Sequence, residues 1–115
     1  MLYENYEKVV ENVKNACARS GRNFDDVTII AVSKTKPLSD VEELLAHGVT
    51  EFGENKVQEM VDKYEHVSKP VHWHLIGHLQ TNKVKYIVDK ACMIHSVDSV
   101  HLAKEIEKEA AKKNL

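Results

Sequence analysis

The sequence is poor in the residues that mark special classes of protein. Its 115 residues include only two cysteines, two prolines and four glycines, and aromatic residues make up 6%. Two cysteines, Cys17 and Cys92, are too few for a disulfide framework, which indicates reduced thiols and a cytoplasmic protein. No low-complexity segment divides the chain, and 43% hydrophobic residues suffice for a folded core. We therefore expect residues 1–115 to form one unit.

Long apolar runs and a strong excess of charge are also missing. The longest uninterrupted apolar stretches, such as residues 29–32, are short, whereas a bilayer-spanning helix needs about 20 residues. The first 15 residues contain acids among the apolar positions, which excludes the pattern of a signal peptide. The net charge is only −2 although 30% of the residues are charged. We therefore expect neither a nucleic acid nor a membrane as partner.

Hydrophobic periodicity at the start of the chain predicts a helix followed by a strand. Apolar residues recur at helical spacing over residues 3–19. Gly21 follows, where a residue in the left-handed conformation often ends a helix. The β-branched run at residues 27–32 does not alternate with polar residues. That pattern predicts a strand buried on both faces, as in a parallel sheet.

The rest of the chain continues this alternation. Ser39 and Glu42 form a capping-box pattern, which predicts a helix that begins at Ser39 and ends before Gly48. The other expected elements are a strand at 49–52, a helix at 55–65, a strand at 72–76, a helix at 80–89, a strand at 91–97 and a helix from residue 99 onward.

The predicted order is one helix followed by four strand–helix units. Short connections between alternating strands and helices require parallel strands joined by right-handed crossovers. Four such units are half of a (β/α)8 TIM-type barrel, which usually takes about 250 residues. An open, doubly wound α/β sheet has the same order of elements, and periodicity alone does not distinguish the two.

Polar residues follow each predicted strand, and functional residues of parallel α/β folds gather at these carboxyl ends. Lys34 follows the first strand at a position from which its amine can point toward the mouth of the sheet. An aldehyde reacts only with a neutral amine, and a free lysine has a pKa of about 10.4. Burial or a neighbouring cation lowers that value. Lys36 is either such a cation or a solvated surface charge.

Histidines form the most conspicuous metal-ligand pattern, but the spacing does not support a metal site. His72 and His74 lie on one face of a regular strand, and His78 and His95 follow in sequence. No spacing among them matches a zinc motif, so we interpret them as hydrogen-bonded or cofactor-adjacent side chains. The sequence also lacks a nucleophile elbow, a dinucleotide fingerprint and a P-loop.

Four motifs together resemble the pyridoxal-phosphate homeostasis protein family. They occur in the family's order and spacing, and the resemblance covers essentially the whole chain. The motifs are AVSKTKP at residues 31–37, FGENKVQE at 52–59, WHLIGHLQTNK at 73–83 and IHSVDS at 94–99.

The resemblance implies a fold, a cofactor and a set of binding residues. It favours the barrel of the alanine racemase N-terminal domain over the open sheet. Lys34 matches the lysine that holds pyridoxal 5'-phosphate as a Schiff base, and Asn55 matches a polar position beside the cofactor. His78 and Ser96 match positions that line the same mouth. The resemblance also implies a protein that carries the cofactor in vitamin B6 homeostasis, without robust catalytic turnover.

The length of the chain differs from what the resemblance implies. Family members are about twice as long, so these 115 residues are expected to be the N-terminal half. The other half supplies a phosphate-binding loop and an arginine that faces the cofactor. Each charge-assisted hydrogen bond that is lost weakens binding by about 1.5–3 kcal/mol. Half a barrel also has two open sheet edges, which predicts self-association.

Two other functions remain open at this point. A racemase that uses pyridoxal phosphate needs an acid or base on each face of the cofactor. Lys34 could be one, but no tyrosine at a strand end supplies the second. The other alternative is a fragment that no longer binds pyridoxal phosphate.

Overall fold

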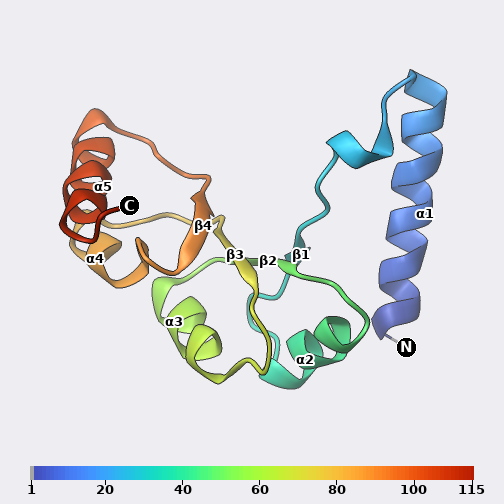
Figure 1. The fold of residues 1–115 in the computed structure, drawn as a ribbon, viewed down its shortest axis with the longest axis horizontal. Helices are drawn as coiled ribbons and strands as arrows, with labels where there is room; N and C mark the ends of the chain where they lie inside the picture. Colours follow the sequence, from blue (N-terminus) through green and yellow to red (C-terminus); the bar gives the residue numbers. More distant parts are fainter. Residues whose placement is uncertain (1) are drawn as a thin grey trace.

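The computed structural model describes residues 2–115, and its elements follow the predicted alternation (Figure 1). In chain order they are α1 (Leu2–Ser20), the 3₁₀ turn η1 (Phe24–Asp26), β1 (Ala31–Val32), α2 (Leu38–Ala46), β2 (Glu51–Glu54), α3 (Val57–His66), β3 (His72–Leu75), the 3₁₀ turn η2 (Thr81–Lys83), α4 (Val84–Ile87), β4 (Ala91–Ile94) and α5 (Val100–Lys112). No helix within residues 2–115 is long and apolar enough to cross a membrane.

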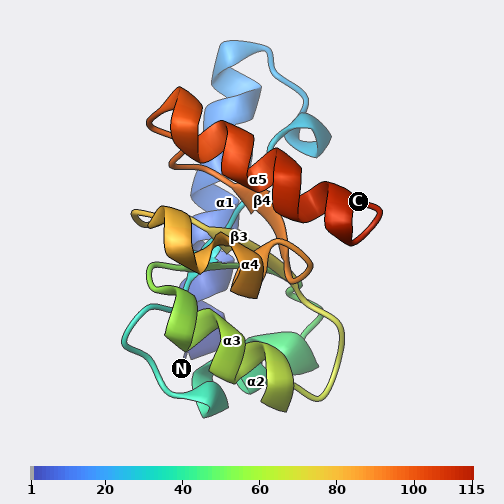
Figure 2. The ribbon, with the colours of Figure 1, turned by 90° about the vertical axis from the view of Figure 1, so that its left-hand side faces the viewer.

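The four strands form one parallel sheet in the order β1-β2-β3-β4. Helices α2 to α5 follow one another along the outer side of this curved sheet, while α1 stands beside α2 at the β1 end (Figures 1 and 2). One helix followed by four consecutive parallel βα units is the arrangement of half a (β/α)8 barrel. The predicted fold class is therefore confirmed.

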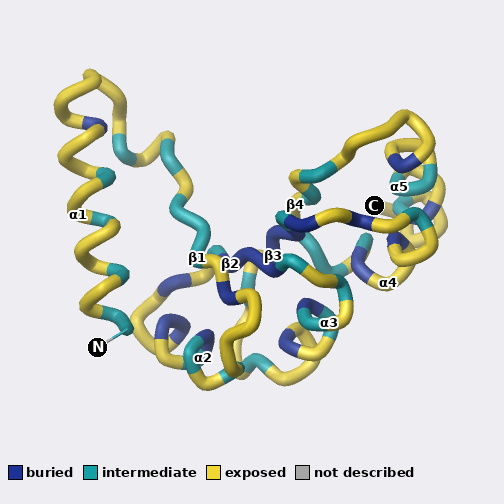
Figure 3. Tube along the Cα trace, turned by 180° about the vertical axis from the view of Figure 1, so that it is seen from behind, coloured by how far each residue is buried: buried dark blue, intermediate teal, exposed yellow. Residues whose placement is uncertain are grey.

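Alternation along the strands separates the two faces of the sheet. Phe52 of β2 and its register partner Trp73 of β3 face the helices, are fully buried, and have ring centroids 6.0 Å apart. Leu75 shares this side with them and is also fully buried. Their neighbours Gly53 and His74, which are paired in register, therefore lie on the inner face. Figure 3 shows buried segments in the central strands β2 and β3 and in the helix sides that face the sheet.

Several predicted boundaries differ from the structure because pairing limits the strands. The predicted strand at 27–32 is reduced to Ala31–Val32. β1 pairs only with β2 among the described strands, and β2 begins at Glu51. The register Ala31↔Phe52 therefore leaves residues 27–29 beyond the start of their partner. The predicted helix at 80–89 is likewise only η2 and the short α4.

The predicted capping box at Ser39 is wrong, whereas two other helix ends are confirmed. α2 begins at Leu38, after Pro37, and has no side-chain cap. Proline has a fixed φ that suits the first residues of a helix, so the helix starts one residue earlier. Gly21 has the expected positive φ, at 75°. The backbone N–H of Leu102 donates to the hydroxyl oxygen of Ser99 at the start of α5.

Candidate functional site

Lys34 lies in a tight loop directly after β1. The backbone N–H of Ser33 still donates to the carbonyl oxygen of Gly53 at 2.9 Å, so the pairing with β2 continues up to this loop. Lys34 itself is exposed to solvent. Thr35 has a φ of 60°, a left-handed conformation that is rare for a β-branched residue. Such strain persists only where neighbouring groups hold the backbone in place, and it is common at binding sites.

Buried charges of β2 and α3 hold this loop. The ammonium group of Lys63 donates to the backbone oxygen of Ser33 at 2.7 Å and to Glu54 Oε2 at 2.9 Å. The hydroxyl of Ser33 donates to the same carboxylate oxygen of Glu54. On the other side of Lys34, the N–H of Thr35 donates to Glu59 Oε2 at 2.6 Å. Backbone groups on both sides of Lys34 are therefore tied to α3.

Gly77, which follows β3, contacts residues that follow β2 and β4. A Cβ atom on Gly77 would overlap the backbone oxygen and the side chain of Asn55, so only glycine fits this close approach. The hydroxyl of Ser96 donates to the backbone oxygen of Gly77. His78 comes next in the chain, and its Nδ1 lies 3.4 Å from Asp98 Oδ2 in an exposed contact. Three of the four predicted site residues are thus gathered around one glycine.

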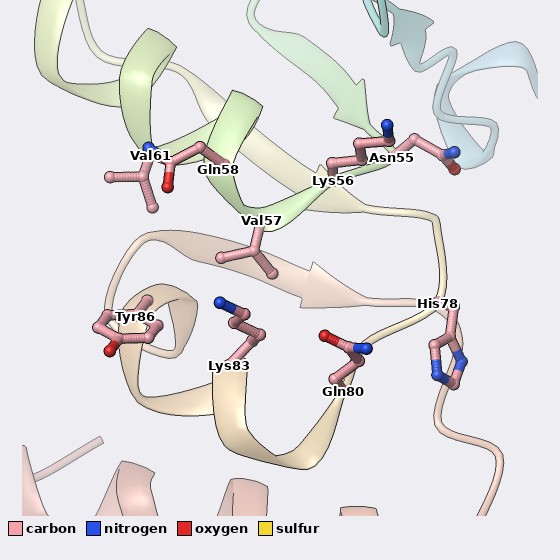
Figure 4. A pocket seen from close by; sticks show the side chains of 9 residues that line it. All are labelled: Asn55, Lys56, Val57, Gln58, Val61, His78, Gln80, Lys83 and Tyr86. Carbon is pink, nitrogen blue, oxygen red and sulfur yellow. The ribbon is translucent and has the colours of Figure 1, made fainter.

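An open groove of about 660 Å³ lies beside these strand ends, between α3 and the η2–α4 segment (Figure 4). Val57 points into it from α3, and Gln80 and Lys83 point into it from the opposite side. Its lining includes Asn55 and His78. Polar and cationic groups therefore come from both sides of the groove, and Val57 and Val61 of α3 add apolar surface. The complete lining is Asn55, Lys56, Val57, Gln58, Val61, His78, Gln80, Lys83 and Tyr86.

A second polar cluster lies on the inner face of the sheet, around the carboxylate of Glu51. Nε2 of His74 lies 2.9 Å from Glu51 Oε1, and Nδ1 of His72 is bonded to the other carboxylate oxygen. Burial opposes ionisation of Glu51, but the hydrogen bonds to both imidazoles outweigh it and hold its pKa below the ordinary value. Burial and the charge of Glu51 raise the pKa of the Cys92 thiol.

The structure brings the predicted histidines together only in part. His72 and His74 share one face of β3, as expected from their spacing, and both contact Glu51. Nδ1 of His74 also lies 2.9 Å from Nε2 of His95. His78 lies apart from them, at the groove.

Sequence reasoning missed the buried anchors of the Lys34 loop. Glu54 and Lys63 are 0% and 7% exposed, although isolated acids and lysines are mostly solvated. One signal was available: Lys63 follows the buried Met60 by three residues and therefore lies on the same face of α3. Glu51 and Cys92 were also missed, because they come from different strands and stand close only after the sheet has formed.

One helix and four consecutive parallel βα units define an α/β protein of the half-barrel type, with a lysine and three polar residues after its strands. Comparison with known proteins identifies the relatives. The chain is 42% identical over 113 residues to the pyridoxal phosphate homeostasis protein of Aquifex aeolicus. The match covers 97% of this chain and 50% of the relative. The Escherichia coli protein of the same name is 37% identical over 106 residues, covering 89% and 45%. No family model matches the chain.

Solved structures agree with this relationship. PipY of Synechococcus elongatus, solved with pyridoxal phosphate bound, is 35% identical with a TM-score of 0.76, covering 89% of this chain and 49% of PipY. The crystal structure of an unknown protein from Bifidobacterium adolescentis gives a TM-score of 0.88 at 26% identity, covering 99% of this chain and 51% of that protein. The chain is thus related over nearly its whole length to the pyridoxal phosphate homeostasis proteins, and it spans about half the length of these relatives.

Proposed function

We propose that this chain binds pyridoxal 5'-phosphate, that it holds the cofactor as a Schiff base on Lys34, and that it acts in cofactor homeostasis without robust turnover. The observation that carries the proposal is the position of Lys34. It is an exposed amine at the carboxyl end of β1, in a loop whose backbone is tied to α3 on both sides. Named relatives and the PipY structure with its bound cofactor support the choice of ligand.

The residues at the strand ends suit this ligand chemically. The amine of Lys34 is the group that would hold the cofactor covalently. Asn55, His78 and Ser96 supply hydrogen-bonding groups at the same edge of the sheet. When bound, the cofactor would supply an electrophilic carbon that reacts with amines. We propose these four residues as its contacts.

A carrier role fits the residues better than racemisation does. Racemisation needs a second acid or base opposite the lysine. Within residues 2–115 the four tyrosines lie on α1, α3 and α4, and none follows a strand. A binding role needs no second acid or base.

The experiment is covalent trapping of the cofactor. The chain is mixed with pyridoxal phosphate, its imine absorbance is recorded, and the sample is reduced with borohydride before peptide mapping. We expect the label on the peptide that contains Lys34. Lys34→Arg should abolish both the absorbance and the label, because guanidinium does not form the imine under these conditions. Lys36→Arg, two residues away and also exposed, is the matched control and should be labelled like the wild type.

Two results would contradict the proposal or part of it. Labelling of Lys36, Lys56 and Lys83 as readily as Lys34 would exclude a specific site and favour a fragment that no longer binds the cofactor. Specific labelling of Lys34 combined with loss of optical purity of an added amino acid would instead support the racemase.

A further inference from the structure

The cluster on the inner face has the composition and dimensions of a metal site. Glu51 of β2, His74 of β3 and Cys92 of β4 each direct one ligand atom toward the others, and these three atoms lie within 4.8 Å of one another. His74 Nε2 is 2.9 Å from Glu51 Oε1 and 3.5 Å from Cys92 Sγ. A carboxylate, an imidazole and a thiol thus converge from three neighbouring strands.

These spacings are close to those around a tetrahedral zinc ion. Zinc binds oxygen and nitrogen at about 2.0–2.2 Å and sulfur at about 2.3 Å, which places tetrahedral ligands about 3.3–3.8 Å apart. The Sγ to Nε2 separation of 3.5 Å falls in this range, and the oxygen to nitrogen separation of 2.9 Å needs a small opening. We propose that Glu51, His74 and Cys92 form a binding site for a thiophilic divalent ion such as Zn²⁺.

The groups behind the ligands support this assignment. A histidine that binds a metal through one ring nitrogen usually has its other nitrogen held by a hydrogen bond, which fixes the tautomer and the ring orientation. His74 has this arrangement, because Nδ1 lies 2.9 Å from Nε2 of His95 while Nε2 points at Glu51 and Cys92. The second oxygen of Glu51 is bonded to His72. Both ligands are therefore oriented by neighbours that leave one atom for the ion.

Ligand chemistry selects the ion. Thiolate and imidazole prefer zinc and other borderline or soft ions, whereas magnesium and calcium prefer sites made of oxygen atoms. Three protein ligands leave one position for a water molecule, as in many zinc sites. No zinc motif is visible in the sequence because the ligands are separated by 23 and 18 residues on three strands. The site is independent of Lys34 and its proposed function.

Spectroscopy with Co²⁺ in place of Zn²⁺ gives the first test. The reduced chain is freed of metal with a chelator and titrated with Co²⁺. We expect saturation at one ion per chain and a near-ultraviolet charge-transfer band, which arises only if a thiolate binds the ion. Cys92→Ser should remove the band. Cys17→Ser, which changes the only other cysteine, is the matched control and should keep it.

Competition between the chain and a chromogenic chelator for Zn²⁺ gives the second test. We expect Cys92→Ser and Glu51→Gln to weaken Zn²⁺ binding at least tenfold. His95→Gln should weaken it by about 10–100-fold while the Co²⁺ band persists, as for a residue behind a ligand. His101→Gln, at an exposed position of α5, should bind as the wild type does. Circular dichroism checks that each variant is folded.

The same measurements can overturn the proposal. Absence of the charge-transfer band in the reduced wild type would exclude a thiolate site. Unchanged Zn²⁺ affinity in a folded Cys92→Ser or Glu51→Gln variant would exclude these ligands.

Discussion

The ammonium nitrogen of Lys63 lies 2.7 Å from the backbone oxygen of Ser33, the residue that precedes Lys34. The same ammonium group is paired with the buried carboxylate of Glu54 at 2.9 Å. A single lysine on α3 therefore neutralises a buried charge of β2 and holds the end of β1. Stability and the shape of the Lys34 loop depend on the same side chain.

Replacement of Lys63 should be strongly destabilising. Lys63→Ala leaves the carboxylate of Glu54 buried without its partner, which typically costs about 3–5 kcal/mol. Urea unfolding can be followed through the fluorescence of Trp73, the only tryptophan, which is fully buried. Lys104→Ala, at an exposed position of α5, should change the free energy of unfolding by less than about 0.5 kcal/mol. Equal effects of the two substitutions would exclude a buried ion pair.

Gly77→Ala should disturb the strand ends where Gly53→Ala does not. The new Cβ at position 77 overlaps the backbone of Asn55, and such overpacking typically costs about 1–3 kcal/mol. A Cβ at Gly53 would meet Cγ2 of Ile30 at 3.1 Å and side-chain atoms of Ile76 at 3.4 Å, so these neighbours need to move by only a few tenths of an ångström. We therefore expect a clearly larger fall in urea midpoint for Gly77→Ala. A smaller loss at position 77 would show that Asn55 is not held there.

Glu42 should contribute to the pH dependence of stability. Its carboxylate accepts hydrogen bonds from the hydroxyl and the backbone N–H of Ser68, which lower its pKa from the ordinary 4.5. A lowered pKa in the folded state stabilises the fold above pH 4.5, and this contribution is lost as the pH falls through the folded-state pKa. We expect Glu42→Gln to lower the melting temperature at pH 7 more than at pH 3.

The control for this pH dependence is Glu107→Gln, which changes an exposed carboxylate of α5. It should not reduce the difference in melting temperature between pH 7 and pH 3 as Glu42→Gln does. A Glu42→Gln variant with the wild-type difference would rule out a contribution from the Ser68 hydrogen bonds.

The exposed inner face should drive self-association. Val32 and Met93 on the two outer strands are 51% and 54% exposed, and β1 and β4 each pair with one strand within the described sheet. We expect sedimentation velocity at micromolar concentration to show dimers or larger species. Val32→Lys should shift the distribution toward monomer. Val9→Lys, on α1 at 48% exposure, should not, and a monomeric wild type would contradict the prediction.

Local patterns predicted the order of elements, but contacts between distant residues determined the details. The turn at Gly21 and the start of a helix at residue 99 depend on neighbouring residues and were predicted correctly. Ser39 fits a capping pattern equally well, yet Pro37 starts the helix earlier and Glu42 bonds Ser68 instead. β1 is also shorter than predicted, because only residues that pair with β2 form the strand.

In the candidate site, too, local patterns predicted some residues and contacts between distant residues determined the rest. Lys34, Asn55, His78 and Ser96 were proposed from their place after strands and from the family motifs, and the structure places all four at strand ends. The partners that hold the site come from other segments. Glu59 and Thr35 are 24 residues apart, and Lys63 and Ser33 are 30 apart, so no local pattern reveals either contact.

Helix α3 contributes both to the groove and to the support of the Lys34 loop. Val57 and Val61 form a wall of the groove, while Glu59 and Lys63 hold the Lys34 loop. Each residue inserted into a helix rotates everything after it by about 100°. An insertion after Gln58 would therefore misplace both anchors and half of the wall at once. Point substitutions can change the lining of the groove. An insertion or deletion in α3 would also displace the loop that positions the amine of Lys34.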